Sequence, residues 1–403
     1  LHLLSRRQRQ MCIRDSCMLK KSVAAVDIRS SSITAVVAER GVNGTFVIKS
    51  KFSCSYDGYA EGQLLDVDGF SRALASVVKS TLAAAGDRVK SLYVGVPGEF
   101  LRLMGTDNVI TFPSLKKVGR SELKSLESAS VPDEREGWYL IRSACLYYVL
   151  SDMRRVVDPS GMLTDSLRGR FCHFLCSSSF CDCVEKALES FAAISEIKYI
   201  PMPYAEGMYL IPPEKRDEYA VLFDFGSISS TYSVLCGNGV AYTESFSLGL
   251  GHIALYLTET MDMPYDVAMA MLGKVNLNSK ESAGGNLEYS YEGKFYSYSA
   301  VEVKEKVREA LDGICETIEE CRQNFTEKEI DYKTVYFTGE CADRIRGAAD
   351  HISGRLVRSV TIVAPSVPYY NKPEFSSLFS LMDMACLLYT SDAAGRLNRC
   401  RSR

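Results

Sequence analysis

The sequence contains no run of about 18 consecutive apolar residues, roughly the length that a helix needs to cross the apolar core of a membrane. The apolar stretch from Leu1 to Leu4 is too short for the core of a signal peptide. The composition therefore predicts neither a membrane span nor secretion, and it favours a cytoplasmic protein.

The chain also lacks an excess of basic residues, since 47 Lys and Arg stand against 50 Asp and Glu. Residues 1–17 and 387–403 each carry four Arg and one Asp without strand or helix periodicity, and we interpret both as non-native flanks around a body that starts at Met18. Without these flanks, each of net charge +3, the net charge falls from −3 to about −9. An acidic body argues against binding to nucleic acid.

The usual spacings of metal ligands are missing as well. A cluster in the middle of the chain contains Cys172, His173, Cys176, Cys181 and Cys183, but its spacing matches no standard zinc pattern. We interpret these cysteines as buried structural thiols, with a zinc site as the alternative. The remaining cysteines of the body are irregularly spaced, which is typical of reduced thiols in the cytoplasm.

A strand-turn-strand pattern, by contrast, occurs twice. Over residues 23–37 and again over residues 220–235, an apolar run ends in an acid, a turn rich in small hydroxyl residues follows, and a β-rich run completes a hairpin. Asp27 and Asp224 are the matching acids. Their separation of 197 positions is too long for a solenoid repeat, so the pattern predicts two related lobes.

Turns of this kind bind phosphate, because backbone N–H groups point at the phosphate oxygens and a nearby carboxylate holds hydrated Mg²⁺. The two hairpins therefore predict a nucleotide cleft between the lobes. In the alternative interpretation, Asp27 and Asp224 only cap their turns.

A chain of this length and hydrophobicity is expected to form two or more domains. The order of predicted elements gives these boundaries: first lobe 18–97, inserted strand-helix-strand-strand module 98–176, return to the first lobe 177–218, second lobe 219–251, its small subdomain 252–299, second lobe continued 300–363, and return to the first lobe 364–386.

Two further features lie in the second lobe. A Gly-rich turn, residues 247–252, precedes a helix, and a late strand ends in Thr338-Gly339-Glu340 before a helix that we expect from about Ala342. Residues 282–299 predict a hairpin with one face of tyrosines. We expect this face to point to the core, and a partner-binding surface is the alternative.

Two Asp-hydroxyl hairpins, a Gly-rich turn before a helix and a late strand ending in Thr-Gly are together the parts of the actin-like ATPase fold. We predict this α/β, two-lobed fold, with the insertion as an SHS2 subdomain. Within that superfamily the chain resembles the FtsA family of bacterial cell-division proteins. The resemblance rests on the place of the insertion, on residues 156–162 with 167–170, and on residues 203–207.

The resemblance implies ATP and Mg²⁺ as cofactors, with Asp27 and Asp224 holding the metal ion through water. It identifies no catalytic residue. It places these residues at the nucleotide: Asp27, Ser30, Ser31, Asp224, Gly226, Ser229, Ser230, Gly249, Gly251 and Gly339.

Several positions depart from the family pattern. Arg29 stands where the first turn has Gly, so it either blocks a phosphate or supplies a cation to it. Thr231 replaces the acid that ends the second turn, residues 268–272 lack the Glu and Lys of the family's nucleoside helix, and Glu340 brings an acid to the nucleotide. These departures predict weakened ATP binding and no efficient hydrolysis.

As an FtsA-like protein, the chain is expected to link filaments of the tubulin homologue FtsZ to the inner face of the membrane at the division site. The FtsZ C-terminal tail would bind about residues 252–299, and the chain would self-associate into dimers or filaments. The family's C-terminal membrane helix is not recognisable, because residues 375–385 run into the flank. We therefore expect a truncated fragment that does not pellet with anionic liposomes.

Two other classes of protein stay open. A pilus-assembly ATPase-like adaptor of the same fold would bind a membrane-protein peptide instead of FtsZ. A sugar-kinase-like or chaperone ATPase is the other, but a kinase requires a catalytic base and a sugar pocket, for which the sequence offers no candidate.

Overall fold

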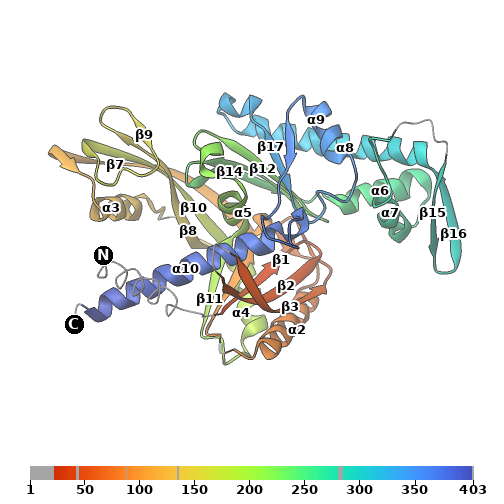
Figure 1. Ribbon diagram of the computed structural model, residues 1–403, viewed down its shortest axis with the longest axis horizontal. Coiled ribbons are helices and arrows are strands. Elements are labelled where there is room, and N and C mark those ends of the chain that lie inside the picture. The colour runs from red at the N-terminus through yellow and green to blue at the C-terminus, as the bar shows by residue number, and fades with distance from the viewer. Residues whose placement is uncertain (1–21, 42–44, 88, 134–135, 280–284, 402–403) are drawn as a thin grey trace, which may run out of the picture.

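The structure is a computed structural model that describes residues 22–41, 45–87, 89–133, 136–279 and 285–401. The flank predicted at residues 1–17 and the start predicted at Met18 lie outside these ranges. Along the long axis of the molecule, the inserted module lies at one end and a protruding hairpin lies at the other (Figure 1). No helix in the described ranges is long and apolar enough to cross a membrane.

The first lobe is built on a five-stranded sheet of order β11-β6-β1-β2-β3. Antiparallel pairing joins β1, β2 and β3, whereas β6 and β11 continue the sheet in parallel. Every residue of β1 is buried, because this strand lies in the middle of the sheet and is covered on both faces. The strands are β1 (Val23–Ile28), β2 (Ser32–Arg40), β3 (Phe46–Ser55), β6 (Ser91–Val96) and β11 (Glu196–Pro201).

The second lobe repeats this sheet, with the order β14-β13-β12-β17-β18. The central strand β12 corresponds to β1 of the first sheet. In both sheets, two antiparallel strands lie on one side of the central strand and two parallel strands lie on the other. The repeated hairpin of the sequence is therefore part of a repeated sheet, as the predicted fold class requires. The strands are β12 (Ala220–Phe225), β13 (Ser230–Cys236), β14 (Gly239–Phe246), β17 (Val335–Thr338) and β18 (Val360–Ile362).

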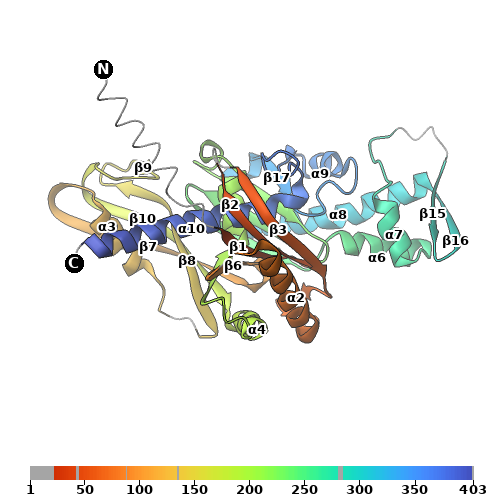
Figure 2. The same cartoon turned by 60° about the horizontal axis from the view of Figure 1, so that its bottom comes forward.

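Helices cover both faces of the first sheet. On the face remote from the second lobe lie α2 (Val67–Ala85) and α4 (Ser178–Leu188), and on the other face lie α5 (Met202–Leu210) and α10 (Ser376–Arg401) (Figures 1 and 2). α2 ends at Gly86, whose φ of +68° favours glycine. The helix α10 continues through residues 387–401 of the predicted flank.

The second lobe carries α8 (Ala300–Asn324), a helix with one apolar face. Positions spaced by three or four residues along it are buried in the core, as a helix packed on a sheet requires. The small subdomain consists of α6 (Leu250–Met261), α7 (Tyr265–Leu272) and the hairpin β15 (Asn286–Tyr291) with β16 (Lys294–Ser299). Its four hairpin tyrosines are half-buried against the core, which confirms the core-facing interpretation: Tyr289, Tyr291, Tyr296 and Tyr298.

The inserted module has the predicted order of strand, helix, strand, strand, and its sheet has the order β7-β10-β8-β9. A small core of its own forms between this sheet and α3. The elements are β7 (Leu101–Lys117), α3 (Arg120–Ser130), β8 (Trp138–Leu150), β9 (Arg155–Val156) and β10 (Leu163–Ser177).

The prediction that a helix begins at about Ala342 is wrong, because α9 (Ala348–Leu356) begins six residues later. The segment before it turns so that Ala342 and Ile345 are buried, and Gly347 precedes the helix with a φ of +86°, which is outside helical geometry. The remaining short elements are β4 (Tyr59–Ala60), β5 (Gln63–Leu64) and the 3₁₀ turns Gly98–Phe100, Pro213–Lys215, Lys328–Tyr332 and Pro373–Phe375.

Candidate functional site

The turns that follow β1 and β12 meet between the two lobes. The hydroxyl oxygen of Ser30 in the first turn accepts a hydrogen bond from the backbone N–H of Ile228 in the second turn, at 3.0 Å. The repeated hairpins therefore face each other, as the sequence predicts, but they are in direct contact.

Arg29, which stands in the glycine position of the first turn, points its guanidinium group between the lobes. Its Nε donates to Oδ2 of Asp27 at 2.9 Å, and its Nη1 lies 3.7 Å from Oε2 of Glu340. Ser377, at the start of α10, donates to the same Asp27 oxygen at 2.6 Å. One carboxylate oxygen of Asp27 is thus already occupied by two donors from the chain.

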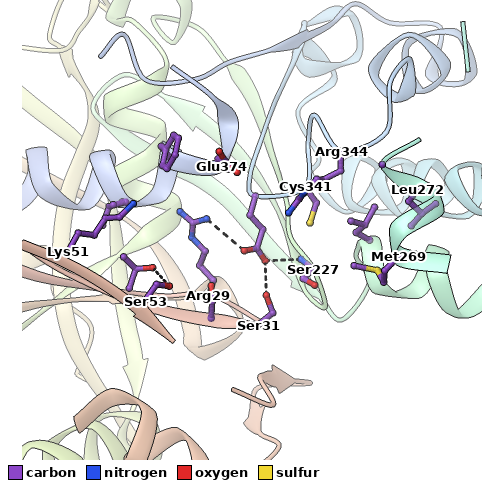
Figure 3. A pocket seen from close by; sticks show the side chains of 17 residues that line it. Arg29, Ser31, Lys51, Ser53, Ser227, Met269, Leu272, Cys341, Arg344 and Glu374 are labelled. Carbon is purple, nitrogen blue, oxygen red and sulfur yellow. Dashed lines mark hydrogen bonds and ion pairs between the residues drawn. The ribbon is translucent and has the colours of Figure 1, made fainter. Parts of the chain in front are cut away.

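Glu340, in the turn after β17, is held by both of the repeated turns, through Ser227 and Ser31, whose hydrogen bonds are drawn as dashed lines in Figure 3. Its Oε1 accepts a hydrogen bond from the backbone N–H of Ser227 at 3.1 Å and one from the hydroxyl of Ser31 at 3.3 Å. Backbone N–H groups and hydroxyls of such turns are the donors that bind phosphate oxygens in nucleotide sites. Here a carboxylate of the protein accepts from them.

Arg29 and Glu340 line two cavities and lie between them. The inner cavity, beside Asp27, Asp224 and Glu206, has a volume of only about 50 Å³. The outer cavity has a volume of about 400 Å³ and extends between β3 of the first lobe and α7 of the second.

The inner cavity is rich in buried carboxyl groups. Burial raises the pKa of Asp224 to about 7, with Arg29 lowering it and the acids Glu340 and Asp27 adding to the rise. Burial likewise raises the pKa of Glu206 well above its usual range, and one oxygen of each of Glu206 and Asp27 has no hydrogen-bond partner among the described residues. The pKa of Arg29 is raised, because its acidic neighbours outweigh the opposing effect of burial.

The predicted site residues divide into three groups. Ser31 lines the outer cavity. Six others line the inner cavity: Asp27, Ser30, Asp224, Gly226, Ser229 and Gly339. Three line neither cavity: Ser230, Gly249 and Gly251.

Those three residues instead support the second turn. The hydroxyl of Ser230 donates to the carbonyl of Leu248 at 2.6 Å, and the N–H of Gly251 donates to the carbonyl of Ser227 at 2.8 Å. A Cβ at Gly249 would lie only 2.5 Å from the carbonyl oxygen of Gly226, so glycine is required for this close approach.

Four residues of the site were not identified from the sequence. Glu206 had a signal, because it is an acid inside the otherwise apolar start of α5, where it is buried. Ser377, Lys51 and Arg344 had none, because they reach the site only through the packing of segments distant in sequence.

Within the described residues, no three or more His, Cys, Asp or Glu side chains are grouped as a metal site requires. In the cysteine cluster, Cys181 and Cys176 contact each other with 3.4 Å between their sulfur atoms, and both are buried. His173 is engaged by the hydroxyls of Thr106 and Ser143, each at 2.9 Å. These contacts fit the structural role predicted for the cluster.

The fold belongs to the actin-like ATPase class. Solved structures that the chain resembles include the PilM-PilN type IV pilus biogenesis complex, with a TM-score of 0.59 and 15% identity over 90% of this chain and 98% of that one. MreB 5 of Spiroplasma citri bound to AMPPNP gives a TM-score of 0.55 with 8% identity over 94% and 99% of the two chains. The predicted fold is therefore confirmed.

By sequence, the chain is similar to the cell division protein FtsA, and the predicted resemblance is confirmed. It is 22% identical over 241 residues to FtsA of Streptococcus pneumoniae serotype 2, covering 59% of this chain and 52% of that protein. It is 22% identical over 257 residues to FtsA of Enterococcus faecalis, covering 62% and 57%. The chain thus spans about half the length of the curated relatives it matches. No family model matches it.

Proposed function

We propose that the chain is an FtsA-like cell-division protein that links FtsZ filaments to the inner face of the membrane at the division site. The observation that carries this proposal is the similarity to FtsA proteins over about 60% of the chain. The cell-division role comes from these relatives, and the actin-like fold supports self-association into dimers or filaments. The sites on the chain for FtsZ and for the membrane are part of the proposal.

We also propose that the nucleotide cleft is degenerate. In a working site, the two turns surround the phosphates of ATP and leave space for them. Here the turns contact each other through Ser30, the carboxylate of Glu340 accepts from Ser227 and Ser31, and a cavity of about 50 Å³ is left inside. A triphosphate would have to displace Glu340 and separate the turns.

A magnesium ion fits this arrangement poorly. One oxygen of Asp27 is bound by Arg29 and Ser377, and Asp224 also interacts with the charge of the Arg29 guanidinium group, whose side chain is only 18% exposed. A divalent cation held by these two acids would be close to the positive charge of Arg29 in a poorly solvated space, where like charges repel strongly. The fixed charge of Arg29 thus takes the place of a metal ion.

The link to FtsZ is tested by binding. A fluorescent peptide with the sequence of the FtsZ C-terminal tail from the same organism is titrated with the protein, and saturable binding at tens of micromolar is expected. Leu255 on α6 is an exposed leucine of the small subdomain, and Leu255→Glu is expected to weaken binding if this subdomain holds the tail.

A matched control is available on the opposite end of the molecule. Leu115 on β7 is also an exposed leucine, so Leu115→Glu introduces the same charge on the inserted module and is expected to leave tail binding unchanged. If the unmodified protein does not bind the tail, the FtsZ link is wrong and a pilus-type adaptor that binds a membrane-protein peptide becomes the better hypothesis.

A further inference from the structure

Two cysteines of the central cluster lie at the joint between the inserted module and the first lobe. Cys176 is the second-last residue of β10, and Cys181 is the fourth residue of α4. In the sheet of the module, Cys176 pairs with Leu101, the first residue of β7, so the chain enters and leaves the module beside this cysteine. Both cysteines belong to the core of the first lobe. A bond between them would therefore fix the junction of β10 with α4.

The two thiols are already in contact. Their sulfur atoms are 3.4 Å apart, which is within hydrogen-bonding distance for sulfur, and both cysteines are free. A disulfide bond is about 2.05 Å long, so the sulfur atoms need to approach each other by only about 1.4 Å to form one. Cys176 and Cys181 are thus a reduced dithiol that is placed for intramolecular oxidation.

Cys181 is the better nucleophile of the pair. The start of an α-helix favours negative charge, and Cys181 lies at the start of α4. The contact with Cys176 lowers the pKa of the Cys181 thiol, and the hydroxyl of Tyr199 acts in the same direction. Burial and the acids Asp182 and Glu185 oppose this effect without cancelling it. The same contact between the thiols raises the pKa of Cys176, so Cys181 is the thiol that loses its proton first.

Burial determines which oxidants reach the pair. The exposed fraction is 0% for Cys176 and 1% for Cys181, so a bulky disulfide such as oxidised glutathione does not fit against either sulfur atom. Hydrogen peroxide is close to water in size, and local opening of the strand-helix junction is enough to admit it. Cys54 and Cys183 are half-buried, and they are the more accessible thiols with which the pair can be compared.

We propose that Cys176 and Cys181 form a dithiol that hydrogen peroxide oxidises to a disulfide, which locks the joint between the inserted module and the first lobe. The Cys181 thiolate attacks one oxygen of the peroxide, the O–O bond breaks, and the leaving hydroxide takes up the proton that Cys181 released. The sulfur of Cys176 then attacks the sulfur of the resulting sulfenic acid, and the thiol proton leaves with the hydroxyl group as water. Two thiols and one peroxide thus give one disulfide and two water molecules, with the peroxide as the electron acceptor.

Treatment of the reduced, folded protein with hydrogen peroxide tests the proposal. After denaturation and alkylation of the remaining thiols, mass spectrometry is expected to show the loss of two thiols per chain and a peptide that links Cys176 to Cys181. Dithiothreitol is expected to restore both thiols. Because the disulfide fixes the joint, the melting temperature of the oxidised protein is expected to be higher than that of the reduced protein.

Two variants separate the roles of the cysteines. Cys181→Ala is expected to abolish both the disulfide and the rise in melting temperature. Cys176→Ala is expected to stop the reaction at the sulfenic acid of Cys181, which a dimedone probe labels. Cys183→Ala is the matched control, because it removes a half-buried cysteine of the same helix and is expected to leave the disulfide unchanged.

The thiols of the unmodified protein decide the proposal even where a variant does not fold. Retention of both Cys176 and Cys181 as thiols, at a peroxide concentration that oxidises Cys54 or Cys183, would overturn it. A disulfide that includes Cys183 would overturn it as well. A disulfide between Cys176 and Cys181 that leaves the melting temperature unchanged would overturn the locking of the joint.

Discussion

Arg29 is the residue on which the interior of the site depends. Among the described residues that line the inner cavity, it is the only cation, and it faces the acids Asp27, Asp224 and Glu340. A buried charge that loses its partner is strongly destabilising, because neither water nor a counter-ion compensates it.

Arg29→Ala is therefore expected to lower the free energy of unfolding by about 3 kcal/mol or more at neutral pH. Arg72→Ala is the matched control, since Arg72 also faces an acid, Asp66, but on the exposed surface of α2. For Arg72→Ala, the free energy of unfolding is expected to fall by well under about 1 kcal/mol. Urea denaturation measures both, and similar losses for the two variants would contradict the role assigned to Arg29.

The carboxyl groups around Arg29 also predict a pH dependence. Because burial raises the pKa of Asp224 to about 7, the folded protein keeps this proton while the unfolded chain loses it near pH 4. The free energy of unfolding should therefore fall as the pH rises from about 4 to about 7. Glu206, whose pKa is also raised, adds to the fall.

Asp224→Asn is expected to flatten this fall, as measured by urea denaturation across the same pH range. Asp87→Asn serves as the control, because the partners Lys49 and Ser22 lower the pKa of Asp87 and its contribution is lost only below about pH 4. An unchanged pH slope in Asp224→Asn would show that Asp224 is ionised in the folded protein.

At the scale of elements, the turn after β17 determines where Glu340 lies. Gly339 has a φ of +106°, and a Cβ on it would lie 2.2 Å from Oδ1 of Asp224 and 2.5 Å from the carbonyl oxygen of Phe225. A Cβ does not fit there and the positive φ favours glycine, so Gly339 allows the turn to approach β12.

Gly339→Ala is expected to destabilise the protein by about 3 kcal/mol, through strain and displacement of Asp224. Gly313→Ala is the opposite case, because Gly313 is exposed inside α8 with no atom within 4 Å of an added Cβ. It is expected to stabilise the protein by about 1 kcal/mol. Thermal unfolding of the two variants compares them, and a tolerated Gly339→Ala would contradict the tight turn.

Most elements could be predicted from local patterns. The hairpins at Asp27 and Asp224, the amphipathic face of α8 and the end of α2 at Gly86 all follow from periodicity and end signals that act over a few residues. The start of α9 could not be predicted from local patterns, because the burial of Ala342 and Ile345 depends on the tertiary core.

The same limit applies to the site. The acids and glycines of the two turns were recognisable from their spacing, and Arg29 and Glu340 were visible as departures from it. That Arg29 and Glu340 meet each other could not be predicted, because they are 311 positions apart and only the packing of the two lobes brings them within 3.7 Å. The contributions of Lys51 and Ser377 required the folded chain for the same reason.

At the scale of the whole molecule, the two lobes are joined by side chains of the protein itself. Besides the contacts of Arg29 and Glu340, Ser247 of the second lobe donates to Oε1 of Glu99 at 3.0 Å and accepts from the N–H of Glu61 at 2.7 Å. The start of α10 is tied to the second lobe where Thr338 donates to Ser376 at 2.7 Å. We therefore expect the closed arrangement of the lobes to need no nucleotide.

Thermal unfolding with and without ATP and Mg²⁺ tests this expectation most directly, because a ligand that binds the folded state raises the melting temperature. The melting temperature of the unmodified protein is expected to stay unchanged, whereas the variant Arg29→Gly with Glu340→Gly, which reopens the space between the turns, is expected to melt lower and to be raised by ATP and Mg²⁺. A rise of several degrees in the unmodified protein on addition of ATP and Mg²⁺ would contradict the self-closed cleft.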